Sequence, residues 1–117
     1  MYADALSLAH AIVETLEEKK GEDITLLDLL GVASFTDYFV ICTCSSERTL
    51  HALADEVHRR VKTKERSGSA KVEGGASSGW VLVDYGDVIL HLMSPAARDY
   101  YRLEELWQAG KVLLRVQ

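Results

Sequence analysis

Residues 80–93 constrain the fold of this chain more than any other stretch, because a short polar turn joins two strongly apolar runs there. The stretch reads WVLVDYGDVILHLM, with Gly86 between Tyr85 and Asp87. A glycine in such a turn allows the positive φ that tight hairpin connections often need. The sequence therefore predicts a β-hairpin whose apolar side chains are buried within a larger sheet.

Three further segments predict helices: residues 2–20, 45–66 and 95–107. In the first two, apolar residues recur at the spacing of an amphipathic helix. Ser45 or Ser46 is the expected N-cap of the second helix, since a serine hydroxyl can accept a hydrogen bond from a free backbone N–H. Pro95 is suited to the first turn of the third helix.

The other strands of the sheet are expected at residues 23–30 and 36–44. The second contains an unbroken apolar run, which is typical of a central strand covered on both faces. Residues 67–79 are rich in glycine and serine and predict a surface loop, while residues 110–116 are either a further strand or a tail. This order of elements predicts an α/β (α+β) fold, with a mixed sheet and helices packed on its faces.

The length and the cysteine content indicate one domain in a reducing compartment. A chain of 117 residues can bury a single core, so residues 1–117 are expected to form one domain. Only Cys42 and Cys44 are present, which leaves no disulfide framework, and residues 1–20 do not have the pattern of a signal peptide. We therefore expect a cytoplasmic protein.

The formal net charge is −5 at pH 7, which disfavours general binding to nucleic acid and favours a basic protein partner. An alternative is an RNA-binding module at the basic end of the second predicted helix. Its residues would be Arg59, Arg60, Lys62, Lys64 and Arg66. Basic residues late in a helix more often form a solvated face that is favoured by the helix dipole.

Residues of the predicted hairpin alternate between two faces. Along an extended strand, Trp80, Leu82 and Asp84 point one way, and the residues between them point the other way. If the second set faces the helices, the first presents an indole, an aliphatic group and a carboxylate on one outward strip, a composition found in protein interfaces. The alternative is that Trp80 is a core residue and that Asp84 and Asp87 only stabilise the turn.

The acids of the predicted hairpin and the two cysteines are candidates for a catalytic or a metal site. Asp84, Asp87 and His91 could bind a metal ion or transfer protons, but the chain has no phosphate-binding loop and no HExxH pair. Cys42 and Cys44 alternate along a predicted strand and lie on one side of it. Because a second pair of ligands is missing, buried structural thiols are favoured over a metal site.

Three blocks in this order resemble the Iojap family of ribosomal silencing factors (RsfS). They are TDYFVICTCSSERTLHALADEV, GWVLVDYGDVILHLM and RDYYRLEELW. The resemblance covers about residues 5–107 and leaves a tail at residues 108–117. It implies a fold similar to that of nucleotidyltransferases, without their catalytic signature.

The resemblance also implies a non-enzymatic regulator with no cofactor. Such a protein docks on a protein of the large ribosomal subunit, large-subunit protein fourteen, at the face where the small subunit joins. By blocking that joining it lowers translation, and family members commonly form homodimers. The docking residues implied by the matching motifs are Trp80, Leu82, Asp84, Asp87, Tyr100 and Tyr101.

Overall fold

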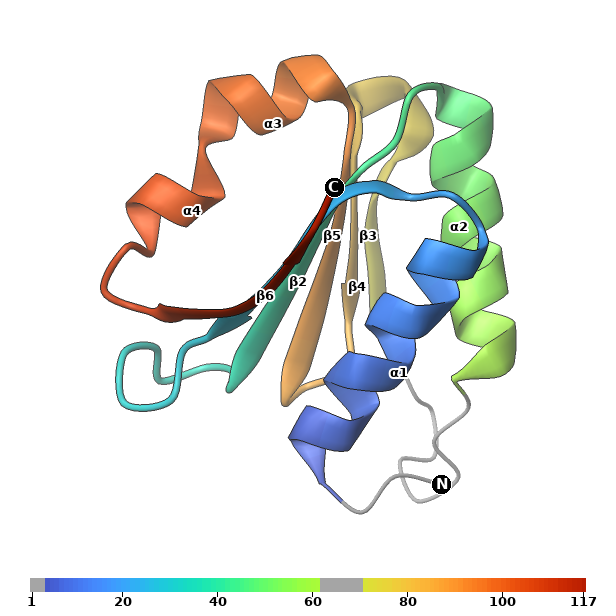
Figure 1. Cartoon of the computed structure of the whole chain (residues 1–117). Helices are drawn as coiled ribbons and strands as arrows, with labels where there is room; N and C mark the ends of the chain where they lie inside the picture. Colours follow the sequence, from blue (N-terminus) through green and yellow to red (C-terminus); the bar gives the residue numbers. More distant parts are fainter. Residues whose placement is uncertain (1–3, 62–70) are drawn as a thin grey trace.

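The computed structural model describes residues 4–61 and 71–117 as one α/β domain built on a six-stranded sheet (Figure 1). The elements in chain order are α1 (Ala5–Glu18), β1 (Glu22–Asp28), β2 (Tyr38–Thr43), α2 (Glu47–Arg60), β3 (Lys71–Gly75), η1 (Ala76–Ser78), β4 (Trp80–Asp84), β5 (Val88–Met93), α3 (Pro95–Tyr101), α4 (Leu103–Leu106) and β6 (Lys111–Val116). The predicted class, a mixed sheet with helices on its faces, is confirmed.

The strand order in the sheet is β3-β4-β5-β2-β1-β6. Strands β2 and β5 run parallel at the centre, and every other neighbouring pair is antiparallel. All residues of β2 and β5 are buried, as expected for strands covered on both faces. The predicted hairpin is β4 and β5, and Gly86 in its turn has a φ of +91°. The central place predicted for β2 is also confirmed.

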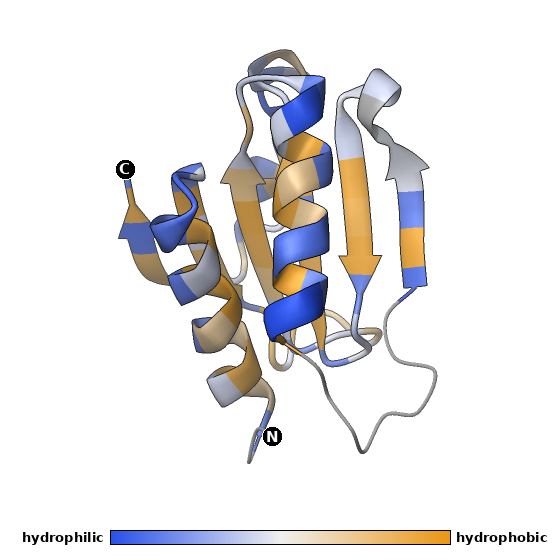
Figure 2. Ribbon diagram, turned by 90° about the vertical axis from the view of Figure 1, so that its right-hand side faces the viewer, coloured by the Kyte–Doolittle hydropathy of each residue, from blue (hydrophilic) through white to orange (hydrophobic). Residues whose placement is uncertain are grey.

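The first face of the sheet is covered by α1 and α2, which pack against it side by side (Figure 2). Each helix has 14 residues and begins at a side-chain cap. Asp4 accepts a hydrogen bond from the backbone N–H of Ser7, and Ser46 accepts one from that of Thr49. The cluster beneath them is mostly aliphatic. It includes Leu8, Ile12, Leu16, Leu50, Leu53, Val57, Leu26, Val40, Leu90 and Leu92.

The second face is covered in part by α3 and α4, which form an arc that rises away from the sheet (Figure 1). Only Ala97 of α3 and Leu103 of α4 are buried. The cluster on this face contains Leu27, Leu29, Phe39, Ile41, Ile89 and Met93, with Trp80, Leu82 and Trp107 partly buried against it. The two faces thus differ in how completely they are closed.

Two expectations from the sequence are wrong in detail. The helix predicted over residues 95–107 is divided at Arg102, whose backbone is left-handed with a φ of +48°. Residues 71–75 of the predicted loop form strand β3, which pairs with β4, while residues 67–70 lie outside the described residues. Residues 111–116, left open as strand or tail, form β6 at the edge of the sheet.

None of the helices described in residues 4–61 and 71–117 is long and apolar enough to cross a bilayer.

Candidate partner-binding surface

Strand β4 shows the alternation that the sequence predicts. Val81 and Val83 are buried against the first face, together with Tyr85 just beyond the strand. Trp80, Leu82 and Asp84 point to the second face and are each partly exposed. The side chains proposed from the sequence as an outward strip therefore share one side of the sheet, the side that α3 and α4 leave partly open.

Trp80 is held in place from two directions. Its indole Nε1 donates a hydrogen bond of 3.1 Å to Nδ1 of His91, and its ring lies 4.5 Å from the ring of Tyr101 on α3. The side chain is neither sealed in the core nor fully exposed. An aromatic ring fixed this way loses little conformational entropy when a partner covers it, which is a property of interface anchors.

His91 is the buried support of this indole. Only 3% of the residue is exposed, and burial lowers the pKa of its imidazole to about 4. The ring is therefore neutral at pH 7. Because Nδ1 accepts the indole hydrogen bond, the proton of the neutral ring is on Nε2, which has no hydrogen-bond partner in the described part of the chain.

A cavity of about 290 Å³ opens beside Trp80, between the β3–β4 hairpin and α3. Its walls are Trp80, Leu82, Tyr101, Glu73, Gly74 and Ser78. Gly74 has a φ of +81°, and a Cβ at this position would lie 2.3 Å from the carbonyl oxygen of Trp80. Only glycine fits there, so strand β3 can approach β4 closely and form one wall. Glu73 and Gly74 were missed because the sequence predicts a loop at this segment.

Tyr100 and Tyr101 extend the aromatic surface along α3. Their side chains are 79% and 47% exposed, and the two rings lie 4.9 Å apart. Tyr101 therefore joins Trp80 to Tyr100, which is directed to solvent. Both residues were singled out from the sequence; Tyr101 packs on the indole, and Tyr100 packs on Tyr101.

The aromatic contacts continue across the second face to the loop between β1 and β2. Neighbouring rings in this series lie between 4.4 and 5.9 Å apart. In order they are Phe35, Trp107, Phe39, His91, Trp80, Tyr101 and Tyr100. Phe35 is 53% exposed at the far end. Sequence reasoning missed Phe35 and Trp107 because their contact depends on two segments that are far apart in the chain.

Asp84 and Asp87 lie at the other end of β4 from Trp80, about 13 Å along an extended strand. One carboxylate oxygen of Asp84 accepts a hydrogen bond of 2.7 Å from the backbone N–H of Gly86. The carbonyl oxygen of Asp87 accepts from the backbone N–H groups of Asp37 and Tyr38. The carboxylate of Asp84 thus stabilises the turn, and the backbone of Asp87 joins the turn to the start of β2. Glu73 is the acid that lines the cavity beside the indole.

A group of polar contacts around Arg98 joins α3 and α4 to the sheet. The side chain of Arg98 is 10% exposed. Its guanidinium donates to Glu104 on α4 at 2.6 Å and to the carbonyl oxygen of Asp23 at 2.6 Å. Burial raises the pKa of Glu104, but the hydrogen bond and positive charge of Arg98 outweigh this, so its pKa lies below the usual value. Glu104 is therefore ionised at neutral pH.

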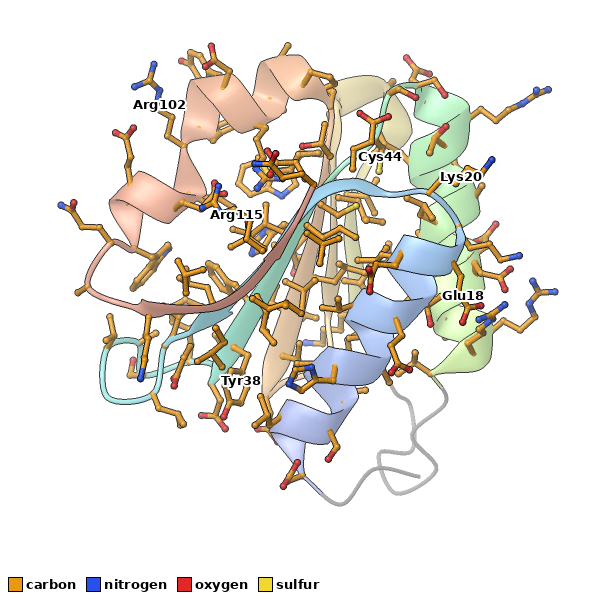
Figure 3. All side chains as sticks on the ribbon, in the orientation of Figure 1. Glu18, Lys20, Tyr38, Cys44, Arg102 and Arg115 are labelled. Atoms are coloured by element: carbon orange, nitrogen blue, oxygen red, sulfur yellow. The ribbon has the colours of Figure 1, made fainter. Side chains whose placement is uncertain are left out.

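The basic helix end proposed as an RNA-binding alternative belongs to α2. Arg59 and Arg60 form ion pairs with Glu56, and Arg60 also pairs with Glu18, so this basic helix end is partly neutralised. The remaining basic residues of that hypothesis, from Lys62 to Arg66, lie outside the described residues. Figure 3 shows Glu18 on α1 facing α2.

The thiols of Cys42 and Cys44 are buried in the first-face cluster, which confirms that they are packing residues. Within residues 4–61 and 71–117, no group of three or more histidine, cysteine, aspartate or glutamate side chains could hold a metal ion.

Comparison with known proteins identifies the family. The model of the family described as "Ribosomal silencing factor during starvation" matches residues 2–116. The chain belongs to this family. The match extends through β6, beyond the limit of residue 107 that the sequence motifs suggest.

Curated relatives support the same assignment. The chain is 44% identical over 100 residues to the ribosomal silencing factor RsfS of Chromobacterium violaceum, covering 85% of this chain and 80% of the relative. It is 39% identical to the RsfS of Bacillus subtilis, covering 78% and 76%. It is also 39% identical to the mouse protein named "Mitochondrial assembly of ribosomal large subunit protein 1", of which 43% is covered.

Solved structures share the fold. A crystal structure of a protein from Chromobacterium violaceum aligns with a TM-score of 0.80 at 39% identity, covering 90% of this chain and 87% of the other. One from Bacillus halodurans aligns with a TM-score of 0.72 at 31% identity, covering 96% and 98%.

Proposed function

We propose that this silencing factor binds the large ribosomal subunit through the second face of its sheet and prevents the small subunit from joining. The partner is a basic protein at the intersubunit face, large-subunit protein fourteen by family resemblance. The observation that carries the proposal is the partly exposed aromatic group formed by Trp80, Tyr101 and Tyr100 beside the cavity. Repression follows from occupancy of the joining surface and involves no catalytic step and no cofactor.

The chemistry of this group supports a protein partner. Tryptophan and tyrosine are enriched among the residues that contribute most to binding, since their large rings exclude water from neighbouring polar contacts. The cavity beside Trp80 can receive a side chain of the partner, with Glu73 at its wall to favour a positive charge. The net charge of −5 favours approach to a basic surface.

The proposal includes two further expectations. We propose that the free protein is a homodimer and that it acts in the cytoplasm. The first expectation rests on the family resemblance, because members of this family commonly form homodimers. Sedimentation of the free protein over a range of concentrations measures the first expectation, and a single monomer mass would contradict it.

Binding to purified large subunits tests the proposal. Co-sedimentation of the wild type and of Trp80→Ala gives the two dissociation constants. Removal of an interface anchor costs about 2 kcal/mol or more, so affinity is expected to fall about 30-fold. Asp84→Lys is expected to weaken binding less, because the carboxylate lies at the turn, far from the indole.

His51→Ala is the matched control, because His51 is an exposed ring on α2, on the opposite side of the sheet. It is expected to bind as the wild type does. Wild-type protein should also reduce the joining of small subunits to large subunits on a sucrose gradient, and Trp80→Ala should not. Normal binding by a folded Trp80→Ala variant would contradict the assigned surface.

A further inference from the structure

We propose that Arg98 is the positioning residue of the binding surface: it fixes the arc of α3 and α4 over the sheet and so sets where Tyr101 meets Trp80. This inference rests on the proposed function, because it concerns the same surface. Arg98 does not itself contact the partner in this account. Its effect on binding passes through the two helices that it holds.

All five N–H groups of the Arg98 guanidinium are used within the protein. Nη1 donates to the carbonyl oxygen of Asp23 at 2.6 Å and to Oγ1 of Thr43 at 2.9 Å. Nη2 donates to Oγ1 of Thr25 at 3.2 Å and to Oε2 of Glu104 at 2.6 Å, and Nε donates to Oε1 of Glu104 at 3.4 Å. An arginine has five such donors, so no donor remains for a ligand.

These bonds tie α3 to three other elements. Asp23 and Thr25 belong to β1, Thr43 ends β2, and Glu104 belongs to α4. The hydroxyl of Thr25 also contacts Glu104, at 3.4 Å, which closes a ring of polar contacts with Arg98. Thr25 and Thr43 are buried, so the two strands hold these hydroxyls in fixed positions beneath the guanidinium.

The arc needs this polar anchor because its apolar contacts are small. Only Ala97 and Leu103 of the two helices are buried. Between them the backbone turns at Arg102, in the left-handed region. The N–H of Arg102 ends α3 on the carbonyl oxygen of Arg98, and the carbonyl oxygen of Arg102 accepts from the N–H groups of Glu105 and Leu106 in α4. The bridge from Arg98 to Glu104 spans this turn. It therefore adds a side-chain contact between α3 and α4 to the backbone hydrogen bonds that meet at Arg102.

The arc carries two aromatic residues of the second face, one at the end of α3 and one directly after α4. Tyr101 lies three residues after Arg98 on α3, on the same side of the helix, and packs on Trp80. Trp107 follows α4 and packs on Phe35 and Phe39. A shift of the arc would move Tyr101 away from the indole and change the wall of the cavity.

Arg98→Met tests the inference, with Arg102→Met as the matched control. Arg102 lies on the same arc, is exposed and is directed to solvent (Figure 3), where it pairs with Glu105 at 3.4 Å. We expect Arg98→Met to bind large subunits about tenfold more weakly than the wild type and Arg102→Met to bind within about twofold. Arg98→Lys should recover only part of the affinity, because an ammonium group cannot reach all of these acceptors.

A spectroscopic signal separates positioning from a general loss of structure. In a Trp107→Phe background, Trp80 is the remaining tryptophan, so its emission reports its contact with Tyr101. We expect Arg98→Met to change this emission while far-ultraviolet circular dichroism stays unchanged. Should Arg98→Met fail to fold, Glu104→Gln breaks the same bridge with a smaller change and gives the same comparison.

Two results would overturn the inference. One is a folded Arg98→Met variant with wild-type affinity. The other is lost affinity with unchanged Trp80 emission, which would mean that Arg98 contacts the partner directly. Failure of the proposed function is distinguishable, because then the wild type does not bind large subunits or Trp80→Ala binds normally, whereas the emission still reports whether Arg98 positions the arc.

Discussion

The two faces of the sheet are built from different chemistry. The first is closed by two long helices over aliphatic side chains, and its core residues are almost all fully buried. The second is covered by two short helices, is rich in aromatic rings, and depends on a buried arginine to hold its cover in place. A face that is completely closed can only stabilise the fold, whereas a partly closed aromatic face can also bind a partner.

The largest effect on stability is expected on the first face. Leu53 of α2 is 2% exposed, and Leu53→Ala should lower the free energy of unfolding by about 2–5 kcal/mol, because the buried side chain leaves a cavity. Urea unfolding measures this loss. Per folded molecule, affinity for large subunits should be unchanged. Reduced affinity in a fully folded Leu53→Ala sample would contradict the division between the faces.

Acid should weaken the second face through His91. The folded-state pKa of about 4 lies below the ordinary value of 6.5, so the unfolded chain binds the proton more readily between these values. The contribution of His91 to stability is thus complete above pH 6.5 and is lost as the pH falls toward 4, by about 3 kcal/mol. Urea unfolding at several pH values measures it.

His91→Phe is the control for this pH dependence, because it keeps a ring in the cluster and removes the titrating group. The difference in the free energy of unfolding between wild type and variant should change across pH 4–6.5, with the slope expected for the uptake of one proton. Two pH curves that run parallel over this range would show that burial does not shift the pKa of His91.

Removal of a helix cap is expected to have the smallest effect on stability, and each face of the sheet offers one such cap. Ser46 caps α2 on the first face, and Ser94 caps α3 on the second, with hydrogen bonds of 3.1 and 3.0 Å to backbone N–H groups. Ser46→Ala and Ser94→Ala should each cost about 1 kcal/mol of stability. Only Ser94→Ala should also reduce affinity for large subunits, because α3 carries Tyr100 and Tyr101. Equal effects on binding would argue against a special role for α3.

Features that depend on a local sequence pattern could be predicted. The alternation along β4 has a period of two residues, so the side of the sheet that Trp80 and Leu82 share could be predicted. Gly86 marked the hairpin turn, and the apolar run of β2 marked the centre of the sheet. In each case, residues within a few positions of one another determine the outcome.

Features that depend on contacts between distant residues, or that lie at an exposed edge of the sheet, could not be predicted from the sequence. Strand β3 is exposed along most of its length, so it lacks the apolar alternation that predicts a strand. The break at Arg102 has neither glycine nor proline to mark it. Arg98 finds its partners in Asp23 and Thr25, more than 70 positions away in the chain, and only the folded sheet brings them together.

Hydroxyl-radical footprinting of the protein, free and bound to purified large subunits, tests the central claim most directly. The readout is the oxidation rate of exposed rings on the two sides of the sheet. The account predicts that Tyr100 and Tyr101 become protected on binding while His51 on α2 reacts as it does in the free protein. Protection of His51 with unchanged oxidation of both tyrosines would place the partner on the first face and contradict the account.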